Sequence, residues 1–112
     1  MRMQDGVKSD LKISVIWEWL NMGRRRVARM VASGEYQMTK HAYDQMIARD
    51  IFIKQVEDAV INGRVVQKWP ERDGEKLAII GERFNGDFIK IVVKDCEIPK
   101  VITVCYPYED ID

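Results

Sequence analysis

Residues 76–94 read KLAIIGERFNGDFIKIVVK, and this stretch decides the fold of the 112-residue chain. Two apolar segments flank Asn85-Gly86. That pair is the strongest short hairpin signal in a sequence, because both central residues of a type I′ turn take positive φ. The stretch therefore predicts two antiparallel strands, 76–84 and 87–94, joined by a two-residue turn.

The turn also predicts a register, in which Phe84 pairs with Asp87 and side chains then alternate between two faces. The further predicted pairs are Arg83 with Phe88, Gly81 with Lys90 and Ile79 with Val92. The predicted helix-covered face carries Ala78, Ile80, Ile89, Ile91 and Val93. The other face carries Ile79, Gly81, Arg83, Phe88, Lys90, Val92 and Lys94. Its three cations fit either a shallow basic groove or the solvated side of an antiparallel sheet.

Further strands and several helices complete the predicted fold. Val-rich residues 64–69, before Pro70, and residues 100–106, before Pro107, predict two more strands, and residues 35–38 predict a short one. Apolar periodicity predicts helices over residues 24–33, 40–49 and 53–62, followed in two cases by Gly34 and Gly63. The pattern indicates an α+β fold, with N-terminal helices packed on a four-stranded, mostly antiparallel C-terminal sheet.

Residues 1–23 predict a helical extension that precedes a single globular unit, residues 24–112. Trp17 and Trp19 are two positions apart, so they point about 200° away from each other on a helix. One of them is expected to pack on the domain and the other to anchor a homodimer or a partner protein. The alternative is that two layers of the same chain cover both.

Composition excludes several classes of protein. The formal net charge is zero, with 18 basic and 18 acidic residues, which argues against a general nucleic-acid-coating protein. Cys96 and Cys105 lack metal-ligand spacing and predict two reduced thiols, with no metal or cofactor. The start of the chain is polar and the apolar run 13–20 is too short for a membrane span, so we expect a cytoplasmic protein with no membrane partner.

Residues 34–51, GEYQMTKHAYDQMIARDI, hold the only histidine, His41. Thr39 is a predicted helix N-cap. Helical spacing puts His41, Gln45 and Arg49 on one stripe, which suits phosphate binding or a mere polar rim. The neighbouring stripe, predicted to face the core, carries Ala42, Tyr43 and Met46.

These residues, with VEDAVINGRVV at 56–66 and VITVCYP at 101–107, resemble the domain-of-unknown-function family 4258 over about residues 24–108. The resemblance implies a small α+β domain like the RelE-type and BrnT-type toxins, which cut messenger RNA without a metal. It also implies a cognate antitoxin as partner, often of zinc-finger type. Two positions depart from the family pattern: Asp50 replaces a glycine, and Phe52 replaces a capping Ser or Thr.

The leading hypothesis is therefore a RelE-like, metal-independent endoribonuclease toxin that acts on RNA. The predicted catalytic residues are His41, as acid or base, with Arg49 and Lys90 at the phosphate. The predicted substrate-binding residues are Lys40, Gln45, Arg83, Lys94 and Tyr106. The alternative is a non-catalytic interaction module that binds protein through the basic helix 24–29 and the sheet edge, with a structural His41. An exposed ring near Lys90 would favour the enzyme, and a buried, paired ring would favour the module.

Overall fold

The computed structural model describes residues 23–84 and 86–109. Three helices precede most of the sheet: α2 (Arg24–Ala32), α3 (Lys40–Ala48) and α4 (Ile53–Asn62). The strands are β1 (Gln37–Met38), β2 (Arg64–Glu71), β3 (Gly74–Phe84), β4 (Asp87–Asp95) and β5 (Lys100–Cys105). The predicted N-terminal helix with Trp17 and Trp19 lies outside the described residues.

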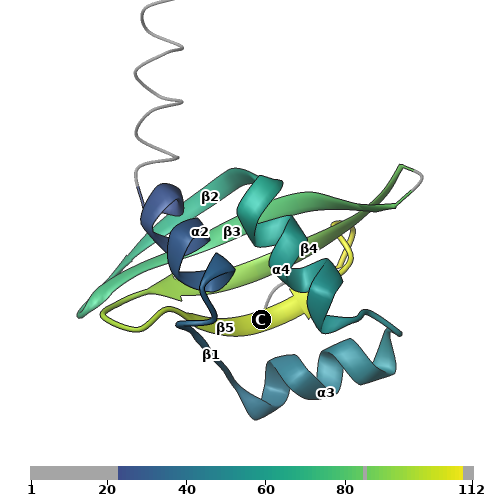
Figure 1. Ribbon diagram of the computed structural model, residues 1–112, viewed down its shortest axis with the longest axis horizontal. Coiled ribbons are helices and arrows are strands. Elements are labelled where there is room, and N and C mark those ends of the chain that lie inside the picture. Colours follow the sequence, from purple (N-terminus) through teal and green to yellow (C-terminus); the bar gives the residue numbers. More distant parts are fainter. Residues whose placement is uncertain (1–22, 85, 110–112) are drawn as a thin grey trace, which may run out of the picture.

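The strands form one five-stranded sheet in the order β1-β5-β4-β3-β2 (Figure 1). Strands β2 to β5 are antiparallel to their neighbours, whereas β1 pairs with β5 in parallel. The predicted α+β class is confirmed. The sheet has five strands instead of the predicted four, because residues 37–38 of the predicted short strand 35–38 form β1 and join it. Residues 37 and 38 join the sheet because Gln37 donates its amide to Pro99 and Thr39 donates its amide to Val101.

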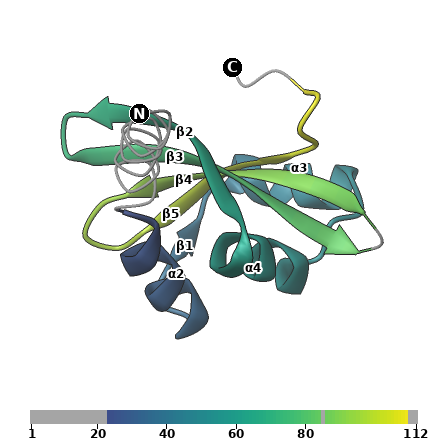
Figure 2. The ribbon, with the colours of Figure 1, turned by 90° about the horizontal axis from the view of Figure 1, so that it is seen from above.

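Helices α2 and α4 cover one face of the sheet, and α3 lies along β5 (Figures 1 and 2). The core under α2 and α4 includes Val27, Val60, Ile79 and Ile91, which are fully buried. No helix within residues 23–84 or 86–109 is long and apolar enough to cross a membrane.

The predicted hairpin register is wrong beyond the first pair, because the ladder shifts between Glu82 and Phe84. Phe84 pairs with Asp87 as predicted, but Gly81 then pairs with Ile89 and Ile80 with Lys90. Such a bulge adds one residue to one strand and moves every later side chain of that strand to the opposite face. The strand faces follow from these pairs and from the buried core. On β3, Leu77, Ile79 and Gly81 face the helices, whereas Ala78, Ile80 and Glu82 face away.

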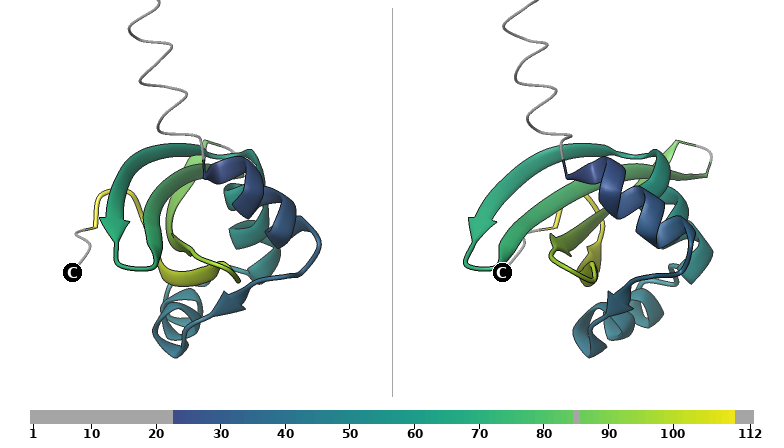
Figure 3. Two further views of the ribbon diagram at one scale, coloured as in Figure 1. Left: turned by 90° about the vertical axis from the view of Figure 1, so that its left-hand side faces the viewer. Right: turned by 60° about the vertical axis from the view of Figure 1, so that its left-hand side comes forward.

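The predicted faces of β4 are correct. Ile89, Ile91 and Val93 belong to the helix-covered core, so Lys90 and Lys94 lie on the other face. Register shifts also occur in the β2–β3 and β4–β5 ladders. Bulges bend a sheet and increase its twist, and Figure 3 shows that this sheet is strongly bent.

The ends of α3 and α4 follow the sequence closely. The Thr39 hydroxyl accepts a bond from the Ala42 amide at 3.1 Å, which confirms the predicted N-cap. Asp50 takes the left-handed conformation of the family's usual glycine, with φ 55°. Phe52 makes no side-chain cap, and the amide of Phe52 instead donates to the Gln55 side chain.

One core prediction for α3 is wrong. Ala42 and Met46 are buried as predicted, but Tyr43 is 56% exposed. The helix packs mainly on β5 at the rim of the sheet, so only a narrow stripe of it is covered. Tyr43 and Ile47, one turn apart, therefore face outward.

Candidate functional site

Three predicted site cations meet around the segment that follows β5. We call Arg49, Arg83 and Lys90 the cation cluster, and residues 106–109 the C-terminal segment. The three cations come from the end of α3, from β3 and from β4. Each contacts the C-terminal segment: Arg49 and Lys90 through hydrogen bonds, and Arg83 across the ring of Tyr106. The fold thus gathers positive charge from two distant parts of the sequence, the end of α3 and the β3–β4 hairpin.

Arg49 binds the carboxylate of Glu109 through two hydrogen bonds, in a bidentate arrangement. Its Nε lies 2.8 Å from Oε2 of Glu109, and its Nη2 lies 2.5 Å from Oε1. The Tyr106 amide donates to the same Oε2 at 2.8 Å. The Tyr106 hydroxyl donates to the Arg49 carbonyl oxygen at 3.0 Å. The guanidinium fork and a backbone N–H therefore converge on one anionic group, in the geometry that suits a carboxylate or a phosphate.

Lys90 points its ammonium group at the backbone of the C-terminal segment. Nζ donates to the carbonyl oxygen of Glu109 at 2.9 Å and lies 3.4 Å from that of Pro107. Its strand partner is Cys105, the last residue of β5. Lys90 thereby places a positive charge beside the fork of Arg49.

Arg83 occupies the bulge in β3 and makes several contacts there. Nε donates to Asp87 Oδ2 at 2.8 Å, and Nη1 donates to the carbonyl oxygen of Asp50 at 3.3 Å. Its guanidinium lies 5.0 Å from the ring centroid of Phe84 and 5.5 Å from that of Tyr106. Arg83 consequently links the hairpin to the α3–α4 turn and to the C-terminal segment.

His41 is exposed, but the fold does not bring it to the cation cluster. It lies eight residues before Arg49, about 12 Å along the helix axis at 1.5 Å per residue. Between them, Gln45 accepts a bond from the Val104 amide at 2.8 Å. Gln45 thus satisfies a backbone donor of β5 beyond the end of β1. The stripe of His41, Gln45 and Arg49 therefore runs along β5, with His41 at the far end.

The remaining predicted binding residues lie elsewhere. Lys40 is exposed and pairs with Asp44, one turn along α3, at 2.7 Å. Lys94 lies four residues beyond Lys90 on β4 and pairs with Asp73 at 2.7 Å, at the end of the sheet that holds the β2–β3 turn. A continuous basic groove from Lys90 to Lys94 is therefore not supported, because acidic residues neutralise its distal end.

The aromatic residues of the C-terminal segment add a flat apolar surface. The rings of Tyr106 and Tyr108 are stacked, with centroids 5.6 Å apart and planes within 2°. Tyr108 is 82% exposed. An exposed tyrosine beside guanidinium groups can stack on a nucleobase while the cations hold its phosphate.

The electrostatics of the site depend on Glu109. Its hydrogen bonds to the Arg49 guanidinium and the Tyr106 amide lower its pKa from 4.5 to about 2. The same pairing with Glu109 raises the pKa of Arg49. Burial raises the pKa of the Cys105 thiol. Near neutral pH, Glu109 is therefore an ionised ligand of an ionised fork.

Nothing in the sequence pattern predicted the acidic group of this site, Glu109. Glu109 follows Pro107 in a stretch without periodicity, and the Glu109 amide donates to the Tyr106 carbonyl oxygen to close a turn. Proline at the second position is typical of such turns. That signal predicts a reversal of the chain after β5, but not the contact with Arg49. Within residues 23–84 and 86–109, no three His, Cys, Asp or Glu side chains are grouped to hold a metal ion.

Comparison with known proteins gives a family and no function. The model of a family described as "Domain of unknown function (DUF4258)" matches residues 38–106, more than half of the chain. The chain belongs to this family. No curated protein and no solved structure matches it. The match begins just before α3 and ends within the site, at Tyr106.

Proposed function

We propose that this DUF4258 protein is a RelE-like endoribonuclease, which cuts messenger RNA without a metal as the toxin of a bacterial toxin–antitoxin pair. The observation that supports this proposal is the Arg49 fork, which holds an anion beside Lys90. A phosphodiester presents the same paired oxygens to a guanidinium as a carboxylate does. The stacked tyrosines supply the surface for a base next to that phosphate.

The chemistry requires two proton transfers and charge stabilisation. The 2′-oxygen loses its proton to a base and bonds to phosphorus, the bond to the 5′-oxygen breaks, and an acid protonates that oxygen. The products are a 2′,3′-cyclic phosphate and a 5′-hydroxyl. A histidine titrates near neutrality and can serve either transfer.

His41 and Arg49 have different proposed roles, because they lie far apart along α3. Because His41 and Arg49 are about 12 Å apart along the helix, they contact different nucleotides of a bound strand. We therefore assign proton transfer to His41 and anchoring of a second phosphate to Arg49, with Arg83 and Lys90 adding positive potential. In this arrangement Lys40, beside His41, is the nearest cation along the chain to the scissile phosphate.

The test is cleavage of an end-labelled messenger RNA in excess EDTA. The parent protein should produce discrete fragments with cyclic phosphate ends. His41→Ala should slow cleavage about 100-fold or more, the usual effect of losing a general acid or base. Arg49→Ala should mainly weaken RNA binding. Full-rate cleavage by both variants, or no cleavage by the parent protein, would reject the proposal.

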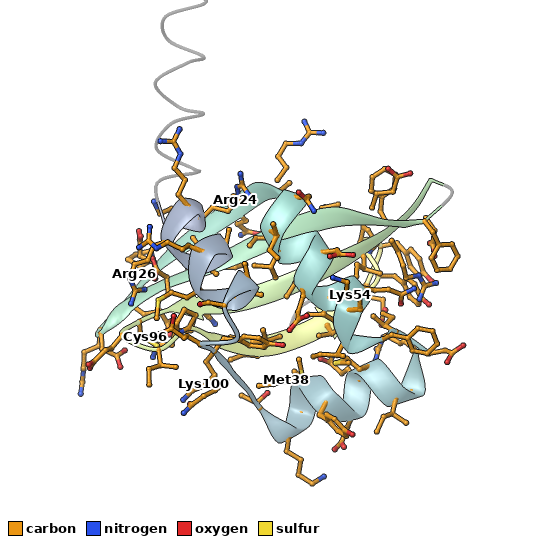
Figure 4. The ribbon with its side chains drawn as sticks, viewed as in Figure 1. Arg24, Arg26, Met38, Lys54, Cys96 and Lys100 are labelled. Carbon is orange, nitrogen blue, oxygen red and sulfur yellow. The ribbon has the colours of Figure 1, made fainter. Side chains whose placement is uncertain are left out.

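Arg26→Ala is the matched control for Arg49→Ala. Arg26 is also an ion-paired arginine: it bonds Asp95 at 2.6 Å and the carbonyl oxygens of Cys96 and Glu97. It lies on α2 beside Cys96 (Figure 4), and its partner Asp95 ends β4, five residues beyond Lys90. Its loss should cost stability but leave cleavage per folded molecule unchanged.

A non-catalytic interaction module is the second candidate, and exposed apolar side chains favour it. Large hydrophobic residues stand exposed on α3, at the start of α4 and around the β3–β4 turn. They are Tyr43, Ile47, Phe52, Ile53, Phe84 and Phe88. Large exposed apolar surface can mark a binding site for a protein partner. Growth arrest on induced expression, relieved by His41→Ala, favours the toxin, whose antitoxin would be the natural partner of this surface. Expression without any effect on growth favours the module.

A further inference from the structure

We propose that Glu109 is an internal plug, which occupies the phosphate-binding fork of Arg49 until RNA displaces it. This inference rests on the proposed function, because it assigns the fork to an RNA phosphate. It adds regulation: the site as folded holds the chain's own carboxylate in the place of the substrate anion.

The carboxylate of Glu109 and an RNA phosphate cannot occupy the Arg49 fork together. Glu109 takes both Nε and Nη2 of Arg49, the two donors that form one side of the fork. It also takes the amide of Tyr106. A phosphate that binds in the same two-pronged manner needs the same donors. The carboxylate and the phosphate therefore compete, and the carboxylate is ionised throughout the physiological pH range.

The plug can leave the fork without unfolding the sheet. Strand β5 ends at Cys105, so the C-terminal segment carries no strand pairing beyond it. Glu109 sits at the end of a turn closed by its own amide bond to the Tyr106 carbonyl oxygen. Apart from the bonds of its carboxylate, its hydrogen bond to the body of the domain among the described residues is the one from Lys90 to its carbonyl oxygen. A rotation of the backbone after Tyr106 would carry the carboxylate away while the cation cluster stays on α3, β3 and β4.

The Arg49–Glu109 pair is accessible to solvent. The side chains of Arg49 and Glu109 each keep 26% of their accessible surface, so the pair lies at the surface and not in the core. A polyanion can approach it from solvent. An ion pair in such a position is worth little enough for a phosphate and a stacked base to replace it.

The test measures binding without cleavage. The probe is a fluorescent 12-nucleotide RNA with 2′-O-methyl groups, which lacks the attacking hydroxyl, and the readout is anisotropy at low salt. Glu109→Gln should bind this probe about five- to tenfold more tightly than the parent protein, because a neutral amide competes weakly for the fork. Glu109→Asp, which keeps the charge but is one methylene shorter, should also bind more tightly than the parent.

Asp95→Asn is the matched control for charge. Asp95 pairs with Arg26 at 2.6 Å, so this variant also removes one negative charge from an arginine–carboxylate pair, but outside the cluster. It should change probe affinity less than twofold. Circular dichroism of each variant checks that the fold persists.

The outcomes test the plug proposal and the endoribonuclease proposal independently. Tighter binding by Glu109→Gln than by Asp95→Asn supports the plug, even if unmodified RNA is never cut, in which case the enzyme proposal alone fails. Equal or weaker binding by Glu109→Gln overturns the plug, even if the parent protein cuts RNA. An absence of probe binding in every variant overturns the plug as well.

Discussion

Acid should remove the contribution of Glu109 to stability in a defined pH window. The native pKa of Glu109 is lowered from 4.5 to about 2 by Arg49 and by the Tyr106 amide. A carboxyl group with a lowered native pKa stabilises the fold above its unfolded pKa, and this stabilisation is lost as pH falls toward the native value. Glu109 should therefore stabilise the protein fully above about pH 5 and hardly at all near pH 2.

The magnitude follows from the size of the shift. A fall in pKa from 4.5 to about 2 is roughly 2.5 units, and at about 1.4 kcal/mol per unit this sets a ceiling of about 3.5 kcal/mol. Solvent reaches a quarter of both side chains, which screens the pair. We therefore expect Glu109→Gln to lower the free energy of unfolding by about 1–2 kcal/mol at pH 7.

The assay is urea unfolding followed by far-UV circular dichroism at pH 7, 5, 4 and 3. The difference between the parent protein and Glu109→Gln should shrink by about half or more between pH 5 and pH 3. Asp58→Asn is the control: Asp58 pairs with Lys54 at 3.6 Å on the exposed side of α4, and its loss should cost less than about 0.5 kcal/mol. A difference for Glu109→Gln that stays constant from pH 7 to pH 3 would show that packing, not charge, holds the segment.

Three further substitutions test the fold around the site by the same urea assay. Gly81→Ala should cost about 2–3 kcal/mol, because an added Cβ would lie 2.6 Å from the Cα of Ala59 on α4. Asp50→Gly should stabilise the protein by about 0.5–1 kcal/mol by relieving a φ of 55°, and it keeps the carbonyl that Arg83 bonds. Tyr36→Phe should cost about 1–2 kcal/mol, because its hydroxyl donates to Glu57 at 2.6 Å.

Local signals in the sequence predicted the elements well. Thr39 caps the start of α3, and Gly34 takes a positive φ of 80° just after the end of α2, as predicted. Gly63 does follow α4, but with φ −80° and an extended conformation instead of the predicted left-handed one. The Asn85-Gly86 pair placed the hairpin turn correctly, and Gly86 has the expected positive φ of 75°. These signals act between residues that are close together in the sequence and do not depend on tertiary packing. A single sequence is therefore enough to predict them.

The predicted β3–β4 register was wrong because tertiary packing determines the observed one. In the predicted register, Gly81 faced away from the helices and Ile80 lay beneath them. The bulge reverses this arrangement and sets Gly81 under Ala59, where a side chain has no room. A glycine inside a strand is itself a sign of close backbone approach or of a bulge. That signal was present in the sequence, but it becomes decisive only when the position of α4 is known.

The cations of the site were predicted, but their surroundings were not. Arg49, Arg83, Lys90 and Tyr106 do converge, although 57 residues separate Arg49 from Tyr106 along the chain. His41 was grouped with them because it shares a helical stripe with Arg49. A stripe fixes direction around the helix axis and says nothing about distance along it. The acidic partners escaped prediction because a single carboxylate in a turn carries no periodic signal.

The site owes its geometry to interruptions of regular structure. Arg49 caps the end of α3, immediately before the left-handed residue Asp50. Arg83 stands in the bulge, which frees its side chain to reach both Asp87 and the Asp50 carbonyl oxygen. Glu109 returns to Arg49 only because the chain turns after β5. Bulges and residues in sparsely populated conformations are often found next to functional sites. A bulge, a left-handed residue and a turn around one anion-binding fork therefore support placing the proposed phosphate site at this end of the domain, and not at the distal end near Lys94.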